Sequence, residues 1–206
     1  MNALTIRDLR KTYPNGFEAL KGISMDVTEG DFFALLGPNG AGKSTTIGIV
    51  CSLVNKSGGS VSVFGHDLDR ERDLAKRCIG LVPQEINFNQ FEQVMDIVVT
   101  QAGYYGIEPE EAGDRAEACL RQLGLWEKRD SVSRSLSGGM KRRLMIARAL
   151  VHSPRLLMLD EPLGALDRAL RDSLQSQVRA ILKEVGVTSI YVTHDRDEAF
   201  AMADRL

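Results

Sequence analysis

The feature that most constrains this chain is a glycine-rich stretch at residues 37–45, which reads Gly-Pro-Asn-Gly-Ala-Gly-Lys-Ser-Thr. It fits the G-x-x-x-x-G-K-[ST] pattern at every fixed position. An apolar run over residues 32–36 precedes it, and a helix-compatible run over residues 45–53 follows it. Because this strand–loop–helix order is the context in which the pattern binds phosphate groups, we expect a nucleotide site here.

The residue types in the loop explain how it would hold a nucleotide. Small residues let backbone N–H groups point toward phosphate oxygens, and the helix that follows presents its positive end to the same anion. Lys43 adds an ammonium for the β- and γ-phosphates, and Ser44 offers a hydroxyl to Mg²⁺. The predicted nucleotide-binding positions are Gly37, Pro38, Asn39, Gly40, Ala41, Gly42, Lys43, Ser44 and Thr45.

The length and composition fit one compact domain in a reducing compartment. The chain has 206 residues, of which 43% are hydrophobic, and a formal net charge of −2. This charge gives no basic field for nucleic acid or anionic lipid, and no apolar run approaches the ~18 residues of a membrane span. The first residues lack the layout of a secretory signal, and three separated cysteines favour buried free thiols. We therefore expect a cytosolic protein.

Polar residues stand directly after three predicted apolar strands. They are Gln84 after residues 79–83, Asp160 and Glu161 after residues 156–159, and His194 after residues 188–193. Ligands of open α/β sheets collect at the carboxyl ends of the strands. We expect Asp160 to hold Mg²⁺ opposite Ser44, and Glu161 to orient and activate the water that attacks the γ-phosphate. The other strand-end side chains should converge on the same phosphate group.

The rest of the pattern predicts a β-rich start and a helical insert. Strand patterns over residues 3–9 and 18–28 flank a Pro-Asn-Gly turn, and Tyr13 stands just before that turn, where its ring could stack on adenine. From about residue 87 to 152 the apolar residues recur at helical spacing without a strand signal. A Ser-Gly-Gly sequence at residues 137–139 opens one of these helices and forms a second potential anion site.

Together these motifs resemble the nucleotide-binding domain of the ATP-binding-cassette (ABC) transporters, and the resemblance covers the whole chain. It implies an α/β phosphate-loop NTPase fold with a parallel core sheet, an N-terminal antiparallel β subdomain and an inserted α-helical subdomain. Within a single domain over residues 1–206, residues 1–86 and 153–206 would form the nucleotide-binding core and residues 87–152 the helical subdomain. The Leu-Ser-Gly-Gly sequence at residues 136–139 is the discriminating element, because many phosphate-loop proteins share the other motifs.

The resemblance also implies a role for each matching residue. By this likeness the adenine-stacking aromatic is Tyr13, the Q-loop glutamine is Gln84, the Walker B aspartate is Asp160, the catalytic base is Glu161, the D-loop aspartate is Asp167 and the switch histidine is His194. The metal ligands are Ser44, Gln84 and Asp160, and catalysis falls to Glu161, His194 and Lys43. The signature residues Ser137, Gly138 and Gly139 would bind ATP held by the phosphate loop of a second copy.

A function and a set of partners follow from the same resemblance. The chain would hydrolyse ATP in the presence of Mg²⁺ and so power transport across a membrane. Two copies would dimerise head to tail around ATP, and hydrolysis would reopen the dimer. The implied partners are that second copy and a transmembrane permease subunit, with no nucleic acid. Membrane contact would occur only through the permease, on the cytoplasmic face of the cell membrane.

Three departures from the family pattern affect these expectations. Met140 stands where the family most often has Gln, but the phosphate contacts come from the preceding residues, so we expect activity to survive. Gly164 replaces the usual D-loop Ser and removes a hydroxyl from the contact between the two copies. Typical members continue beyond the switch histidine, whereas this sequence ends at Leu206. We expect a fragment or a shortened domain with an exposed sheet edge.

The two parts of the sequence resemble different subfamilies. Residues up to about 160, with Leu-Ser-Gly-Gly-Met-Lys-Arg-Arg-Leu at 136–144, are similar to the ATPase subunits of exporters. From Pro162 onward, Leu-Gly-Ala-Leu-Asp at 163–167 and Tyr-Val-Thr-His-Asp at 191–195 are similar to importer ATPases. The longer N-terminal match favours export. A recombined or designed chain would also explain the mixture.

Two functions from other classes share some of these motifs. A soluble ABC ATPase acting on ribosomes or DNA would carry them, but this chain has no tandem cassettes, no long coiled-coil insert and no basic excess. A binding module without hydrolysis would follow if the shortened fold were unstable. ATP turnover that disappears in Glu161→Gln, while ATP binding persists, would exclude the binding module.

Overall fold

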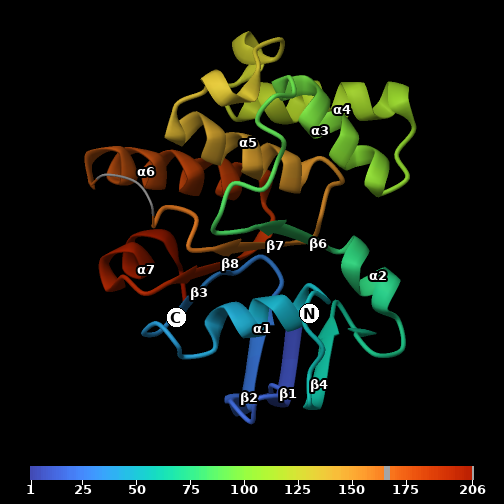
Figure 1. Cartoon of the computed structure of the whole chain (residues 1–206), viewed down its shortest axis with the longest axis vertical. Helices are drawn as coiled ribbons and strands as arrows, with labels where there is room; N and C mark the ends of the chain where they lie inside the picture. Colours follow the sequence, from blue (N-terminus) through green and yellow to red (C-terminus); the bar gives the residue numbers. More distant parts are fainter. Residues whose placement is uncertain (165–167, 206) are drawn as a thin grey trace.

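The computed structural model describes residues 1–164 and 168–205, and it arranges them in layers around a parallel sheet (Figure 1). The strands of this sheet are β3 (Phe32–Leu36), β6 (Ile79–Val82), β7 (Leu156–Asp160) and β8 (Thr188–Thr193). Their order is β3-β8-β7-β6, and every neighbouring pair is parallel. The predicted parallel core sheet is therefore confirmed, and all of its strands end at the same edge.

Strand β7 shows why a continuous apolar run forms the middle of this sheet. The four residues Leu156, Leu157, Met158 and Leu159 are each at most 1% exposed, because both faces of the strand are covered. Leu157 and Leu159 pack with Tyr191 in a core shared with the helices, whereas Leu156 and Met158 pack in a second core shared with the N-terminal sheet. Burial of such a side chain stabilises the fold by about 1.5–3 kcal/mol.

The N-terminal part forms a second, antiparallel sheet, as predicted. Its strands are β1 (Asn2–Thr12), β2 (Glu18–Thr28), β4 (Gly58–Val63) and β5 (His66–Asp67), in the order β2-β1-β4-β5. The turn between β1 and β2 closes when the Gly16 N–H donates to the Tyr13 carbonyl at 2.9 Å. Gly16 has φ of 81°, which an Asn-Gly turn requires of its glycine.

Helices cover both faces of the parallel sheet (Figure 1). On the side of the antiparallel sheet lie α1 (Lys43–Val50) and α2 (Arg72–Arg77). The opposite side carries α3 (Val94–Tyr104), α4 (Pro109–Gln122), α5 (Gly138–Leu150) and α6 (Arg168–Val185), with short 3-10 turns at Trp126–Lys128 and Ser133–Ser135. Helix α7 (Arg196–Met202) packs beside β3 and β8. In the described residues, no helix is both long and apolar enough to cross a membrane.

The backbone after α7 runs along the outer edge of β3. The Asp204 N–H donates to the Phe32 carbonyl at 2.8 Å, and the Ala34 N–H donates to the Arg205 carbonyl at 2.8 Å. Arg205 also pairs with Asp31 at 2.9 Å. The expectation of an exposed sheet edge is therefore wrong along this part of β3, because the chain returns parallel to the strand and takes up its backbone groups.

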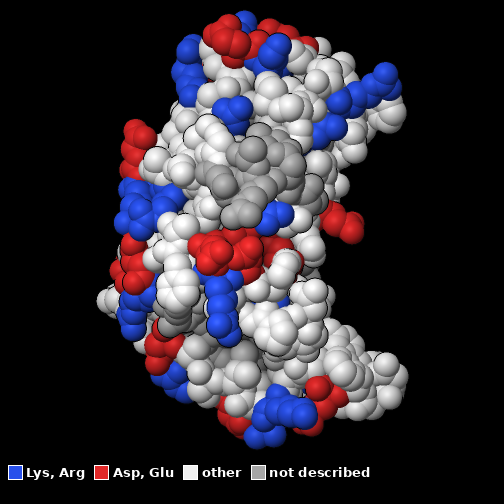
Figure 2. All heavy atoms as spheres, turned by 90° about the vertical axis from the view of Figure 1, so that its left-hand side faces the viewer, with Lys and Arg blue, Asp and Glu red and all other residues white. Residues whose placement is uncertain are grey.

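Charged side chains of both signs are interspersed over the face shown in Figure 2. Surface ion pairs join different segments of the chain, including Arg7 with Asp26 at 2.8 Å between β1 and β2, and Arg155 with Glu29 at 2.7 Å. Pairs this exposed contribute about 0–1 kcal/mol each, so they affect solubility more than stability. The mixture of signs agrees with the formal net charge of −2.

Candidate functional site

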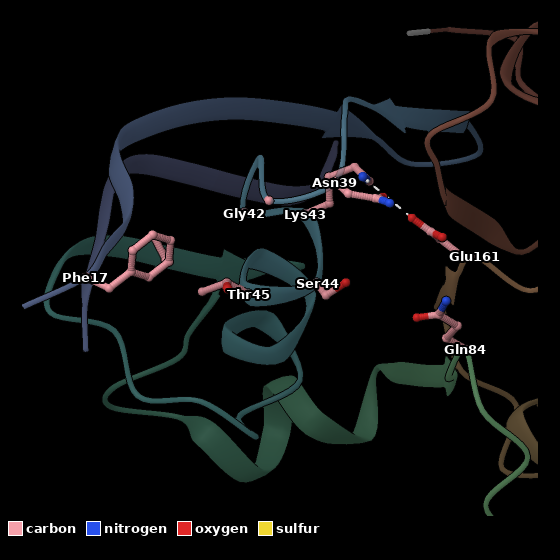
Figure 3. A pocket seen from close by; sticks show the side chains of 10 residues that line it. Phe17, Asn39, Gly42, Lys43, Ser44, Thr45, Gln84 and Glu161 are labelled. Carbon is pink, nitrogen blue, oxygen red and sulfur yellow. Dashed lines mark ion pairs between the residues drawn. The ribbon is translucent and has the colours of Figure 1, made fainter. Parts of the chain in front are cut away.

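The parallel sheet gathers the predicted polar residues at one edge, where its strands end. The phosphate loop follows β3, His194 follows β8, Glu161 follows β7 and Gln84 comes shortly after β6. In Figure 3, the side chains of Lys43, Gln84 and Glu161 approach one another at this edge. Residues more than 150 positions apart in the sequence therefore come together because parallel strands end on the same side.

Glycine is required at the end of the phosphate loop by the backbone and by its neighbours. Gly42 has φ of 86° and stands immediately before the first residue of α1. A Cβ atom at Gly42 would lie 2.5 Å from the Leu20 Cδ2 atom and 2.8 Å from the Ala19 carbonyl oxygen. With no side chain at this position, the first N–H groups of α1 stay available to an anion.

Lys43 lies beneath the loop rather than in solvent. The residue is 7% exposed, and its Nζ atom donates to the carbonyl oxygens of Gly37 at 2.7 Å and Pro38 at 3.1 Å. The same ammonium lies 3.5 Å from the Glu161 Oε1 atom, the ion pair marked in Figure 3. The loop and the strand-end carboxylate therefore share one positive charge.

Glu161 connects Lys43 to His194. Its Oε2 atom lies 3.0 Å from the His194 Nδ1 atom, which extends the contacts into a chain from Lys43 through Glu161 to His194. The Glu161 side chain is 12% exposed, whereas the His194 side chain is 49% exposed. Glu161 has φ of 42°, a left-handed backbone that costs a non-glycine residue about 1–2 kcal/mol. Strain of this kind is concentrated at functional sites.

Ser44 and Asp160 form the second polar contact at this edge. The Ser44 hydroxyl donates to the Asp160 Oδ1 atom at 3.3 Å. Burial raises the pKa of Asp160, the charge of Glu161 also raises it, and the Ser44 hydrogen bond and the Lys43 charge lower it. A desolvated carboxylate of this kind is stabilised by a nearby cation.

The side chains of Ser44, Asp160 and Gln84 are of the types that bind Mg²⁺. A hydroxyl, a carboxylate and the Gln84 amide offer the hard oxygen ligands that Mg²⁺ prefers. Within the described residues, no cluster of three or more His, Cys, Asp and Glu side chains is arranged to hold a metal by itself. This fits a Mg²⁺ ion that takes one or two carboxylates from the protein and the rest of its ligands from phosphates and water.

A cavity of about 330 Å³ opens beside these groups. Its lining residues are Phe17, Ala19, Asn39, Gly40, Gly42, Lys43, Ser44, Thr45, Gln84 and Glu161. The lining includes Phe17, which is 57% exposed and lies across the cavity from Gln84 (Figure 3). The sequence reasoning did not identify Phe17. The signal was available, because this second aromatic follows the same turn that Tyr13 precedes.

Tyr13 contacts the cavity wall without lining the cavity itself. Its hydroxyl shares a hydrogen bond of 3.4 Å with the Thr45 hydroxyl, and its ring lies 6.4 Å from the Phe17 ring at an interplanar angle of 22°. The Lys11 ammonium lies 4.9 Å from the centre of the Tyr13 ring. Tyr13 and Phe17 thus form one aromatic surface, and stacking of adenine on Tyr13 stays a prediction.

The predicted signature residues do not join this cavity. Ser137 caps α5, accepting a hydrogen bond from the Met140 N–H at 3.3 Å, and both Ser137 and Gly138 are exposed. Neither they nor Gly139 belong to the cavity lining. The predicted D-loop residue Asp167 lies outside the described residues.

Comparison with known families gives one clear match. The model of the ABC transporter family matches residues 20–164, which is more than half of the chain. The matched range contains the phosphate loop, Gln84, the Leu-Ser-Gly-Gly sequence and the two carboxylates at the carboxyl end of β7, Asp160 and Glu161.

Curated relatives include proteins named for import and for resistance. The chain is 38% identical over 203 residues to the linearmycin resistance ATP-binding protein LnrL of Bacillus subtilis, covering 98% of this chain and 65% of that protein. It is 34% identical over 203 residues to the sn-glycerol-3-phosphate import ATP-binding protein UgpC of Vibrio cholerae, covering 98% of this chain and 54% of that protein. The chain thus spans between half and two thirds of the length of these relatives.

Solved structures share the architecture. The chain is similar to cbiO1 from Clostridium perfringens, described as part of the ABC transporter complex cbiONQ, with a TM-score of 0.87 and 31% sequence identity. The similarity covers 98% of this chain and 82% of that chain. It confirms the predicted α/β fold, with its parallel sheet and its antiparallel β subdomain.

Proposed function

Because the chain belongs to the ABC transporter family, we propose that it is the ATP-binding and ATP-hydrolysing subunit of an ABC transporter. The observation that carries this proposal is the contact chain from Lys43 through Glu161 to His194 beside the phosphate loop. Lys43 and Glu161 line the cavity, and His194 contacts Glu161, so a cation for phosphates, a carboxylate for water and an imidazole lie at one edge of the parallel sheet. The matched family and the named relatives support the same activity.

The phosphate loop would bind the triphosphate through its backbone. The N–H groups after Gly42 would bind phosphate oxygens at the start of α1, and Lys43 would exchange its contact with Glu161 for the β- and γ-phosphates. Ser44, Asp160 and Gln84 would hold Mg²⁺, which when bound neutralises charge on the phosphate oxygens. Phe17 and Tyr13 provide the aromatic surface on which the adenine would stack.

Glu161 would act as the general base. Its carboxylate is held between an ammonium and an imidazole, so it can orient a water molecule and accept its proton as the water attacks the γ-phosphate. The His194 Nδ1–H donates to Glu161, and in the protonated imidazolium the Nε2–H would in addition donate to a γ-phosphate oxygen. The reaction converts ATP and water into ADP and phosphate.

The experiment that tests this proposal measures ATP turnover and ATP binding on the same protein. We expect Mg²⁺-dependent release of phosphate from the intact chain, and loss of at least about 100-fold in Glu161→Gln while ATP still binds. Glu111→Gln, at an exposed glutamate on α4, is the matched control and should keep full turnover. Binding without turnover in the unmodified chain would instead support a binding module.

We further propose that the active form contains two copies and a permease. Ser137 and Gly138 are exposed and absent from the cavity of their own copy, which suits contact with the nucleotide of a second copy. ATP should therefore increase the dimer fraction of Glu161→Gln, measured by light scattering. The permease would place the protein at the cytoplasmic face of a membrane. Co-purification with ribosomes instead would favour a soluble ABC ATPase.

For the direction of transport we propose export, with import as the second candidate. The sequence around the signature and the 38% identity to LnrL, a resistance protein, support export. The sequence from Pro162 onward and the similarity to UgpC, named for import, support the alternative. Reconstitution of the chain with its co-purifying permease in inverted vesicles distinguishes them, because export then appears as ATP-driven uptake.

A further inference from the structure

A buried carboxylate lies on α7, the helix that follows His194 in the sequence. Glu198, on α7, is only 6% exposed. Its Oε2 atom accepts hydrogen bonds from the Thr193 hydroxyl at 2.7 Å and from the Tyr191 hydroxyl at 3.2 Å. Its Oε1 atom lies 3.6 Å from the Arg171 Nε atom on α6. A buried carboxylate is costly unless it is paired and hydrogen-bonded, so this network fixes the end of β8 to two helices.

Thr193 links that network to the backbone on the far side of His194. Its hydroxyl donates to Glu198, and the same oxygen accepts a hydrogen bond from the Asp195 N–H at 3.0 Å. Asp195 in turn caps α7, because its Oδ1 atom accepts from the Asp197 N–H at 2.8 Å. His194 therefore stands at the tip of a short turn whose two sides are both held.

His194 has little else to orient its ring. Its side chain is 49% exposed, and within the described residues its side chain makes one hydrogen bond, to Glu161. A half-exposed imidazole explores several rotamers, and its Nδ1 atom reaches Glu161 only in the rotamers that start from a suitable Cα position. The position of its Cα atom therefore decides how often the ring meets Glu161.

We propose that Thr193 and Glu198 are positioning residues that hold His194 against Glu161 for the hydrolysis of ATP. This inference rests on the proposed ATPase function. Neither residue lines the cavity, and both act through the backbone of His194. The competing explanation is that the network only stabilises the fold, as a buried hydrogen-bonded carboxylate also does.

Thr193→Val tests the proposal, because it keeps the side-chain shape and removes the shared hydroxyl. We expect kcat to fall about tenfold while KM for ATP changes less than twofold, since the phosphate loop is untouched. Thr193→Ser retains the hydroxyl and should recover most of kcat. Unchanged kcat in Thr193→Val would overturn the proposal.

Thr188→Val is the matched control at the other end of the same strand. Thr188 is also buried, and its hydroxyl accepts a hydrogen bond from the Gly30 N–H at 2.9 Å, away from the cavity. Both valine variants should lose a similar amount of thermal stability, but Thr188→Val should keep its kcat within twofold. Equal losses of kcat in both variants would assign Thr193 a structural role only.

Two further measurements separate this inference from the proposed function. In a His194→Ala background, Thr193→Val should lower kcat no further, whereas an additional tenfold loss would contradict positioning through His194. Without ATP, ¹⁵N NMR of the imidazole should show a fixed Nδ1–H tautomer in the unmodified chain and an averaged one in Thr193→Val. That readout tests the positioning of His194 even if ATP turnover is absent. An identical imidazole spectrum in both proteins would overturn the proposal that Thr193 positions His194.

Discussion

Two helices in this molecule begin at glycine-rich sequences, and they differ in what their first backbone N–H groups bond to. At α1, Gly42 leaves the first N–H groups without a side-chain cap, and the loop lies over the buried Lys43. At α5, Ser137 caps its own helix by accepting from the Met140 N–H, and the start of the helix is exposed. The first start is built to receive an anion from within the same copy. The second uses a side-chain cap for the Met140 N–H, and its exposed Ser137 and Gly138 are accessible to another molecule.

The difference between the two helix starts predicts its largest effect, a loss of MgATP affinity, for substitution of Lys43. Lys43→Ala should weaken MgATP binding on the order of 100-fold, about 3 kcal/mol, because a buried cation that would contact phosphate oxygens is removed. Lys141→Ala, at the start of α5, removes an exposed ammonium that bonds the Gln90 side chain at 3.2 Å. It should leave binding within twofold. Titration calorimetry measures both, and similar losses would erase the contrast between the two helix starts.

A second test compares two glycines of the phosphate loop. Both Gly40 and Gly42 have positive φ, but a Cβ at Gly40 would meet no heavy atom within 4 Å. Gly42→Ala adds a collision with the Leu20 side chain and the Ala19 carbonyl, so it should destabilise the fold by about 2–3 kcal/mol. Gly40→Ala should cost only about 1 kcal/mol. Urea unfolding gives both free energies. Equal losses of stability would mean that the close contact of Gly42 with Leu20 and Ala19 does not fix the start of α1.

The far end of α5 provides a pH-dependent test. His152 bonds the Ile79 carbonyl at 3.0 Å and stacks on Tyr105 with ring centres 3.6 Å apart. Burial lowers the pKa of His152 from 6.5 to about 4. The unfolded chain therefore binds a proton before the folded chain does, and stability is lost as pH falls from about 6.5 toward 4.

Since solvent reaches part of the ring, we expect a loss of about 2 kcal/mol over that range. Urea unfolding at pH 7.5, 5.5 and 4.5 measures it. His152→Phe keeps a ring on Tyr105 but gains no proton, so its stability should depend less on pH. Parallel curves for the two proteins would show that the end of α5 is not anchored through a neutral imidazole.

The smallest expected effect is at the cap of α5. Ser137→Ala should cost about 1 kcal/mol of stability, because the Met140 N–H loses its acceptor. In dilute protein it should leave MgATP binding within twofold, since Ser137 lies outside the cavity of its own copy. Calorimetry at protein concentrations that keep the chain monomeric measures this. Weaker binding there would place the start of α5 in the same site as α1.

The sequence was enough to predict the sheet and the groups at its edge. Apolar runs that end in polar residues identified β6, β7 and β8, because a strand buried on both faces needs continuous hydrophobicity. The helix-spaced segment between β6 and β7 likewise contains helices in the described residues. Local pattern and strand direction together place Lys43, Glu161 and His194 at one edge.

Features that depend on the path of the chain in space were not predictable in this way. Phe17 reaches the cavity only because the hairpin of β1 and β2 folds beside the loop. The edge of β3 is covered because the backbone at Arg205 returns along it. Nothing in the local sequence indicates that Glu198 is buried, because its ion pair and hydrogen bond come from Arg171 and Tyr191 on other elements.

The contacts of Lys43 also affect the relative affinity of the cavity for different anions. Its ammonium already touches two carbonyl oxygens and the carboxylate of Glu161, so an incoming ligand gains only the difference between its own oxygens and those it displaces. An anion with one weak charge gains little from that exchange, whereas a chain of phosphates contacts the ammonium and the helix start together. The ion pair between Lys43 and Glu161 therefore favours binding of a nucleoside triphosphate over binding of chloride or inorganic phosphate.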